Sequence, residues 1–278
     1  MATLPQADWT KREDLAQLIA ALGADNTRYV GGAVRDSLLG KDIHDIDCAT
    51  PLHPAEVIDR CKDAGIRTIP TGIDHGTVTA ILPQGNVEIT TLRRDVSTDG
   101  RRATVAFATE WKEDASRRDF TINALYAHPE TLEIDDDFGG VTDLEAARVR
   151  FIGDARERIR EDHLRILRYF RFQTRFGDDW DDEATAACEE LASTLKGLSR
   201  ERVGWELQNL LALPDPSPTV FKMRELGVMQ QVLPECGKRE AENLAQLVKT
   251  ERDYEISPDA MRRLAAMLPP VPPVAEAV

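Results

Sequence analysis

The stretch YVGGAVRDSLLGKDIHDIDCATP, residues 29–51, holds two glycines, an arginine and two aspartates in a short span. A short strand-like run leads into Gly31 and Gly32, and a helical stretch that carries Arg35 follows them. Backbone N–H groups at such a turn can approach a phosphate, and Arg35, one turn along the helix, adds positive charge. The turn is therefore a candidate phosphate-binding site.

Two carboxylates follow in the same stretch. Side chains alternate along a strand, so Asp45 and Asp47 are expected on one face of DIDCAT while Ile46 points into the core. Two carboxylates this close repel each other, and hard oxygen ligands of this kind suit Mg²⁺, which keeps room for phosphates and water. Glu88 alternates in the same way in NVEITTL, and a neighbouring strand could carry it to the same ions. The pattern predicts a Mg²⁺ site at these three carboxylates.

Each of these features has a common structural explanation when it is taken alone. A Gly-Gly pair is most often only a turn, and two aspartates separated by one residue occur by chance on solvated strands. In this order and spacing, however, they favour a site for a metal-bound nucleoside triphosphate.

The composition is typical of a soluble globular protein with two domains. The chain has 278 residues, of which 42% are hydrophobic and 30% charged, and a single core usually stops growing at about 250 residues. No apolar run approaches the roughly 20 residues of a membrane span. The first nine residues lack the basic and apolar regions of a signal peptide. We therefore expect a cytoplasmic protein with no membrane partner.

The charge distribution sets a limit on nucleic-acid binding. A net charge of −14 argues against a general nucleic-acid binder, which usually carries a basic excess. Residues 148–175, however, hold nine arginines against four acids. This stretch suggests a local basic track, which would be selective about what it contacts.

Hydrophobic periodicity divides the chain into a mixed part and a helical part. The segment 11–23 has apolar residues at helical spacing after a Thr10 N-cap, and residues 77–92 read as two strands joined by a turn. From about Gly153 onward the pattern is helical almost throughout. The sequence predicts an α+β head with a small mixed sheet in about the first 130 residues, followed by an all-helical part.

The motifs resemble a known family. GGAVRDSLLG followed by DIDCAT is similar to the opening motif of the class II CCA-adding tRNA nucleotidyltransferase and bacterial poly(A) polymerase family, and further blocks agree in order from about residue 28 to 211. The blocks are LRRDVSTDGRRATVAFATEWKEDASRRDFTINALY, DFGGVTDLEAARVRFIGD, REDHLRILRYFRF and SRERVGWELQNLL. The resemblance implies a polymerase-beta-like head.

The resemblance also implies a domain plan. The nucleotidyltransferase head is expected over residues 1–145, a helical neck that recognises the nucleotide base over 146–213, and a partial helical body with a Pro-rich end over 214–278. Relatives of the CCA-adding type usually continue further, with body and tail elements that hold the tRNA.

The implied activity is template-independent addition of CCA to the tRNA 3′ end, with CTP and ATP as nucleotide donors and pyrophosphate as the leaving group. With two Mg²⁺ ions, one lowers the pKa of the attacking 3′-hydroxyl and the other holds the triphosphate, and Asp45 and Asp47 would bridge them. Two alternatives stay open: a partial (CC- or A-adding) enzyme or poly(A) polymerase of the same family, and a non-catalytic RNA-binding protein that keeps the head fold.

REDHLRILR carries a second constellation. On a single helix, Asp162 and Arg165 are three residues apart and share a face, with Arg168 just beyond. An ordinary surface ion pair would explain this spacing. Cytosine and adenine both present an amino donor beside a ring-nitrogen acceptor, so a carboxylate and a guanidinium could read both bases and reject guanine and uracil. The resemblance assigns that base-reading role to Asp162 and Arg165.

Two further segments complete the predicted site. DVSTDGRRATVAF reads as an exposed mobile loop, and either it is an inert hairpin connection or, as the resemblance implies, Asp99, Gly100, Arg101 and Arg102 help to switch from C to A addition. In SRRDFTINALY an apolar helix is expected to start after Arg118, which by analogy binds the triphosphate or ribose; Asp119 would cap that helix.

Overall fold

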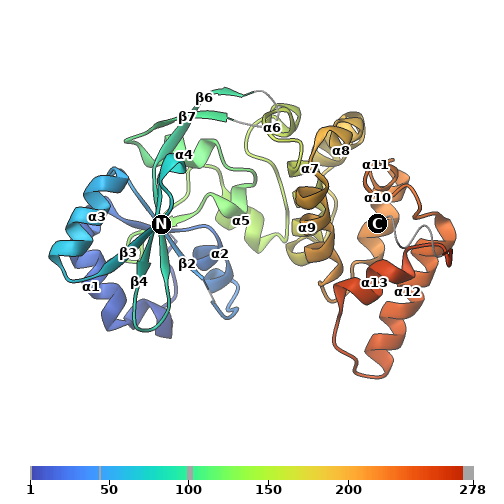
Figure 1. The fold of residues 1–278 in the computed structure, drawn as a ribbon, viewed down its shortest axis with the longest axis horizontal. Coiled ribbons are helices and arrows are strands. Elements are labelled where there is room, and N and C mark those ends of the chain that lie inside the picture. Colours follow the sequence, from blue (N-terminus) through green and yellow to red (C-terminus); the bar gives the residue numbers. More distant parts are fainter. Residues whose placement is uncertain (1, 44, 99–102, 272–278) are drawn as a thin grey trace. The chain divides into compact units, whose positions relative to one another are not determined.

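The computed structural model describes residues 2–43, 45–98 and 103–271 (Figure 1). The described residues form two compact units, one of residues up to 146 and one of residues from 147 onward. Within the described ranges, no helix has the length and apolar character that crossing a membrane requires.

The first unit is built on a mixed seven-stranded sheet, as expected for an α+β head. The strand order is β3-β4-β5-β2-β1-β8-β9. The pair β2–β5 is parallel, and the other neighbouring pairs are antiparallel. The strands are β1 (Arg28–Val30), β2 (Ile46–Thr50), β3 (Arg67–Gly72), β4 (Thr77–Ile81), β5 (Val87–Thr91), β8 (Tyr126–Ala127) and β9 (Ile134–Asp135).

The helices of the first unit are α1 (Glu13–Leu22), α2 (Gly32–Leu38), α3 (Pro54–Asp63), α4 (Trp111–Ser116) and α5 (Gly140–Glu145). Two of them, α1 and α2, lie where the sequence predicted them. The expected Thr10 N-cap is wrong, because α1 begins after Arg12 and the Thr10 hydroxyl instead donates to the carbonyl of Ala7 at 2.8 Å. The helix expected after Arg118 is also wrong: only the 3₁₀ turn η4 (Thr121–Asn123) forms before β8.

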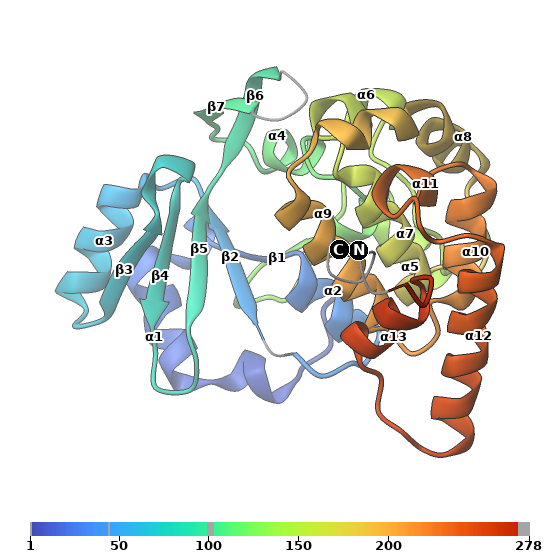
Figure 2. The ribbon, with the colours of Figure 1, turned by 45° about the vertical axis from the view of Figure 1, so that its right-hand side comes forward.

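The core of the first unit lies on one face of the sheet. Helix α1 packs against α3, which packs against β3 and β4 (Figure 2). Leu15 and Leu18 of α1 are buried in one cluster with Ile46 and Cys48 of β2 and Ile89 of β5. Since side chains alternate along a strand, the residues between these core positions on β2 and β5 project from the opposite face.

A separate two-stranded hairpin belongs to the same unit. Strand β6 (Arg93–Thr98) pairs antiparallel with β7 (Ala103–Phe107). The predicted specificity loop, Asp99 to Arg102, lies outside the described residues.

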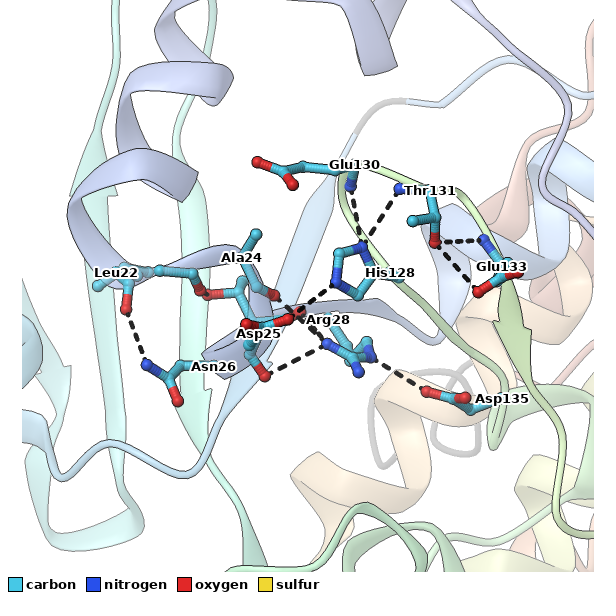
Figure 3. Close-up of polar contacts among 12 residues, drawn as sticks. Leu22, Ala24, Asp25, Asn26, Arg28, His128, Glu130, Thr131, Glu133 and Asp135 are labelled. Atoms are coloured by element: carbon cyan, nitrogen blue, oxygen red, sulfur yellow. Dashed lines mark hydrogen bonds and ion pairs between the residues drawn. The ribbon is translucent and has the colours of Figure 1, made fainter.

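Strand β1 is fixed at its N-terminal end by polar contacts (Figure 3). The Arg28 guanidinium pairs with Asp135 of β9 at 3.0 Å and lies 4.8 Å from the ring centroid of Trp111. The His128 Nε2 lies 3.6 Å from the Asp25 carboxylate. These contacts fix the start of β1 to the edge of the sheet. The glycine turn at the other end of β1 therefore follows a strand whose position is fixed.

From Ala155 onward the described part of the second unit consists of helices and their connections, as predicted. Its helices are α6 (Ala155–Glu161), α7 (Arg165–Phe176), α8 (Asp182–Leu191), α9 (Arg200–Leu211), α10 (Ser217–Glu225), α11 (Met229–Val232), α12 (Lys238–Asp253) and α13 (Ala260–Ala266). Helix α7 packs against α9, and α13 packs against both α9 and α12. The division into neck and body at residue 213 stays a prediction.

A buried arginine ties the last helices to α9. Arg263 on α13 is 1% exposed and pairs with the buried Glu251 of α12 at 2.8 Å. Its guanidinium also donates to the carbonyls of Leu211, Leu213 and Pro214, which follow or end α9. One side chain therefore closes the C-terminal end of α9 and neutralises a buried carboxylate.

We expect Arg263→Met to lower the free energy of unfolding by about 3 kcal/mol, because it removes a cation from buried Glu251 and the donor from three carbonyls. Urea unfolding of the full chain, followed by circular dichroism, measures this. Lys222→Met, which removes the surface ion pair with Glu225, is the matched control and should cost less than about 0.5 kcal/mol. Equal, small losses in both variants would contradict the role of Arg263.

Candidate functional site

The glycine turn lies between β1 and α2, as the sequence predicted. Gly31 has a φ of +63°, a backbone conformation that L side chains rarely adopt, and Gly32 begins α2. A Cβ added to Gly31 would lie 3.5 Å from Nη1 of Arg118, and one added to Gly32 would lie 3.8 Å from Nη2 of Arg35. The structure thus brings both predicted glycines and both predicted arginines of the head together.

The two arginines differ in how they are held. Arg35 is buried, and its guanidinium donates to Asp36 at 2.8 Å and to the Asn123 side-chain oxygen at 2.5 Å. Asn123 in turn donates to Asp119 at 3.0 Å. Asp119 was expected to cap a helix; its carboxylate instead accepts from Asn123 and from the N–H of Phe120. Arg35 therefore fixes the turn to η4.

Arg118 is more exposed than Arg35, and neighbouring side chains orient its guanidinium. Its Nε donates to the Tyr126 hydroxyl at 2.9 Å, and its Nη2 pairs with Asp114 at 3.2 Å. The guanidinium lies 5.0 Å from the centroid of the Tyr126 ring. With a fifth of its side chain exposed, Arg118 keeps a fixed positive charge beside Gly31.

Asp114 is the buried carboxylate on which this arrangement depends. It accepts from Tyr126 at 2.6 Å, pairs with Arg117 at 2.8 Å and accepts the backbone N–H of Arg93, the first residue of β6. Burial alone would raise the pKa of Asp114, but Arg118 and Arg117, with the hydrogen bond from Tyr126, lower the pKa to about 2. The carboxylate is thus charged near neutral pH.

Two of the three predicted metal carboxylates, Asp47 and Glu88, meet at the β2–β5 pair. Asp47 is half-buried and lies in register with the exposed Glu88 on the parallel neighbour. Burial, then Glu88 and Asp45, raise the pKa of Asp47 to about 6, against the lowering effect of Arg118. One expectation is wrong in detail: Asp45 is exposed and precedes β2 instead of lying in the strand.

The donor set fits Mg²⁺ in its chemistry. All three groups are carboxylates. Burial first, and then the negative charge of Glu88, raises the pKa of Asp47, and a cation would offset that neighbouring charge. The three carboxylates do not, however, converge on a preformed metal centre, because no group of three or more His, Cys, Asp or Glu that could hold a metal is found among the described residues. Water and phosphate oxygens would complete the shell, as is usual for Mg²⁺.

The predicted base-reading residues sit at a break between two helices. Asp162 has extended backbone angles after α6, and Arg165 is the first residue of α7. The expectation of a single continuous helix is therefore wrong. The Asp162 carboxylate accepts from Nη2 of Arg202 at 2.8 and 3.1 Å, and Arg165 pairs with Glu161 at 2.6 Å.

Arg168 lies one turn further along α7. Its guanidinium is 3.7 Å from Glu206 of α9 and 5.4 Å from the centroid of the Phe172 ring. Glu206 is 1% exposed and also pairs with Arg171 at 2.6 Å. Arg168 is therefore part of a buried ionic link between α7 and α9.

Sequence reasoning missed the groups that hold the predicted residues in place. These are Asp114, Tyr126, Glu161, Arg202 and Glu206. The spacing Asp114 to Arg118 (i,i+4) and Glu161 to Arg165 (i,i+4) was a usable signal. Arg202 and Glu206 lie in the block SRERVGWELQNLL, but 40 and 35 residues separate them from Asp162 and Arg171.

The predicted residues fall into two sets in different units. The glycine turn, Arg35, Arg118 and the carboxylates belong to the first unit, and Asp162, Arg165 and Arg168 belong to the second. In the first unit the glycine turn, the two arginines and the Asp47–Glu88 pair lie together, whereas Asp45 lies before β2. In the second unit the side chains of Asp162, Arg165 and Arg168 each pair with a different residue.

Comparisons with known proteins agree on one family. The family described as "Poly A polymerase head domain" matches residues 27–150, and "Probable RNA and SrmB- binding site of polymerase A" matches residues 180–238. A mouse (Mus musculus) protein named CCA tRNA nucleotidyltransferase 1, mitochondrial, is 41% identical over 262 residues, which cover 92% of this chain and 59% of the relative. A CCA-adding enzyme of Leuconostoc citreum is 40% identical over 213 residues, covering 76% and 51%.

Solved structures share the fold. The Bacillus stearothermophilus CCA-adding enzyme in complex with CTP has a TM-score of 0.70 at 28% identity, covering 95% of this chain and 67% of that one. A tRNA nucleotidyltransferase complexed with a primer tRNA and an ATP analogue has a TM-score of 0.75 at 23% identity, covering 90% and 74%, and supports the fold alone. The chain spans about half the length of the curated relatives it matches, between 43% and 59%.

We expect Asp114→Asn to lower the free energy of unfolding by about 2 kcal/mol at pH 7. The pKa of Asp114 is lowered from 3.8 to about 2, so this stabilisation is full above about pH 4 and is lost as the pH falls toward 2. Unfolding in urea at pH 7 and pH 3 measures it, and the gap between wild type and variant should narrow at pH 3.

The surface substitution Asp137→Asn, next to Lys112, is the control and should leave stability nearly unchanged at both pH values. A gap between wild type and Asp114→Asn that stays constant with pH would contradict the assignment of the charge to Asp114.

Proposed function

Since the chain belongs to the class II CCA-adding tRNA nucleotidyltransferase and bacterial poly(A) polymerase family, we propose that it adds CCA to the 3′ end of tRNA. CMP and AMP are transferred from CTP and ATP, and pyrophosphate is released. The observation that carries the proposal is the register pairing of Asp47 with Glu88, beside the glycine turn and Arg118.

In the head, three carboxylates would hold Mg²⁺. Asp45, Asp47 and Glu88 supply hard oxygen ligands at the β2–β5 pair. When bound there, the metal supplies activation of the 3′-hydroxyl and stabilises charge on the triphosphate. The turn at Gly31 lets the phosphates approach the backbone, and Arg118 places a fixed guanidinium beside them. No side-chain nucleophile is required.

In the second unit, the base of the incoming nucleotide is read by Asp162 and Arg165. Asp162 accepts a hydrogen bond from the amino group of C or A, and Arg165 donates to the adjacent ring nitrogen. Arg202 pairs with Asp162 and Glu161 pairs with Arg165, and these contacts orient the two side chains. Because the nucleotide does not have to order either side chain on binding, more of the binding free energy is available to discriminate C and A from G and U. Arg168 supports the same helix through Glu206.

Two alternatives differ in their products. A partial enzyme would add only C or only A, and a poly(A) polymerase would extend an A tail. A non-catalytic RNA-binding protein would add nothing. Incubation with tRNA that lacks its 3′ end, Mg²⁺ and each labelled nucleotide in turn separates these cases. The switching role of Asp99, Gly100, Arg101 and Arg102, and a cytoplasmic location, stay predictions.

We expect Asp47→Asn to reduce nucleotide addition at least about a thousandfold, because it removes a metal ligand while keeping the volume of the side chain. The assay is incorporation of labelled CMP into tRNA without its CCA end. Asp63→Asn, an exposed carboxylate at the end of α3, is the matched control and should stay near wild type. Near-normal turnover of a folded Asp47→Asn protein would refute the metal assignment.

We expect Arg165→Ala to reduce discrimination against U and G by about ten- to a hundredfold, more than it reduces turnover, because one charge-assisted hydrogen bond is lost. Incorporation of all four nucleotides onto tRNA that ends at the discriminator base measures this. Arg156→Ala, which removes a surface ion pair with Glu190 on α8, is the control. An unchanged preference for C and A in Arg165→Ala would mean that this residue does not read the base.

A further inference from the structure

Trp205 on α9 is a largely exposed aromatic residue. It is 59% exposed, and it is the tryptophan among the exposed large hydrophobic residues of the described chain. An indole on the solvent side of a helix contributes little to folding, and single-stranded nucleic acids commonly stack their bases on such rings.

The ring is supported by a cation that cannot move freely. The Arg171 guanidinium lies 5.8 Å from the centroid of the Trp205 ring. Two hydrogen bonds, 2.6 and 3.3 Å long, hold that guanidinium on the buried carboxylate of Glu206. The charge on Arg171 is thus fixed in place by a neighbour that is 1% exposed. A base that stacks here would lose little entropy to ordering the protein.

The position of Trp205 on α9 connects it to the predicted base-reading residues. Arg202, three residues earlier on the same helix, holds the Asp162 carboxylate at 2.8 Å. Residues three apart on a helix are neighbours on its surface. The ring therefore lies about one helical turn from the ion pair that orients the base-reading carboxylate.

We propose that Trp205, backed by Arg171, is a stacking site for an unpaired base at the 3′ end of the RNA primer. The inference rests on the proposed function and deepens it. Asp162 and Arg165 recognise only bases with an amino group beside a ring-nitrogen acceptor, which suits the incoming nucleotide. The last base of the primer changes with every addition, so it needs a contact that tolerates any base, and stacking provides one because every base has a π-face.

The test is the affinity for two RNA probes without nucleotides, in wild type and variants. Trp205→Ala should weaken binding of a tRNA that ends at the first C of CCA by roughly tenfold. It should leave unchanged the binding of the same tRNA trimmed of all unpaired 3′ residues. Trp205→Phe should recover most of the affinity. In turnover, the KM for tRNA should rise while the KM for CTP stays constant.

The matched control is Tyr254→Ala, an aromatic residue of the same unit that is 75% exposed; it should bind both probes as wild type does. Equal affinity of Trp205→Ala and wild type for the untrimmed tRNA would overturn the inference, as would equal weakening for both probes. These binding results are independent of catalysis. If the wild type adds no nucleotide to tRNA, while Trp205→Ala still weakens binding of the untrimmed tRNA, the proposed function is refuted and the stacking site is retained.

Discussion

Asp47 and Glu88 stand opposite each other on the parallel strands β2 and β5, and Asp45 adds a third negative charge at the start of β2. Like charges on neighbouring strands destabilise a sheet unless a cation offsets them. Parallel pairing at this point in a largely antiparallel sheet puts them in register. The apolar residues between them face the α1–α3 layer, so the alternation that builds the core also gathers the carboxylates on the other face.

The same pairing of opposite charges organises the second unit. Asp162 is held by Arg202, Arg165 by Glu161, and Arg168 and Arg171 by Glu206. The basic track expected in residues 148–175 is therefore largely neutralised by acids of α6, α8 and α9. Each ion pair fixes the direction of its side chains. Side chains with fixed directions are suited to recognising the hydrogen-bonding pattern along one edge of a base.

Local patterns were enough to predict much of this structure. The alternation in DIDCAT and NVEITTL predicted which side chains leave the core, and the apolar spacing in residues 11–23 predicted the buried face of α1. The break at Asp162 was not predictable in this way, because REDHLRILR contains no glycine or proline to end a helix. The extended conformation of Asp162 coincides with an ion pair to a residue 40 positions later. Contacts of that kind leave no trace in local periodicity.

An acidic protein with a net charge of −14 gains no long-range attraction for a polyanion such as the RNA of the proposed function. Affinity then has to come from short-range contacts, and those are most effective when the protein groups are already in position. Arg171 illustrates how this can be achieved: its charge is balanced by Glu206, yet its guanidinium still backs the ring of Trp205. An arginine whose charge is balanced by a neighbouring acid adds little general affinity for phosphate. Because that acid also fixes the direction of the guanidinium, the arginine can still discriminate between bases. That balance fits the proposed function, in which the protein engages one end of an RNA and ignores the rest of its backbone.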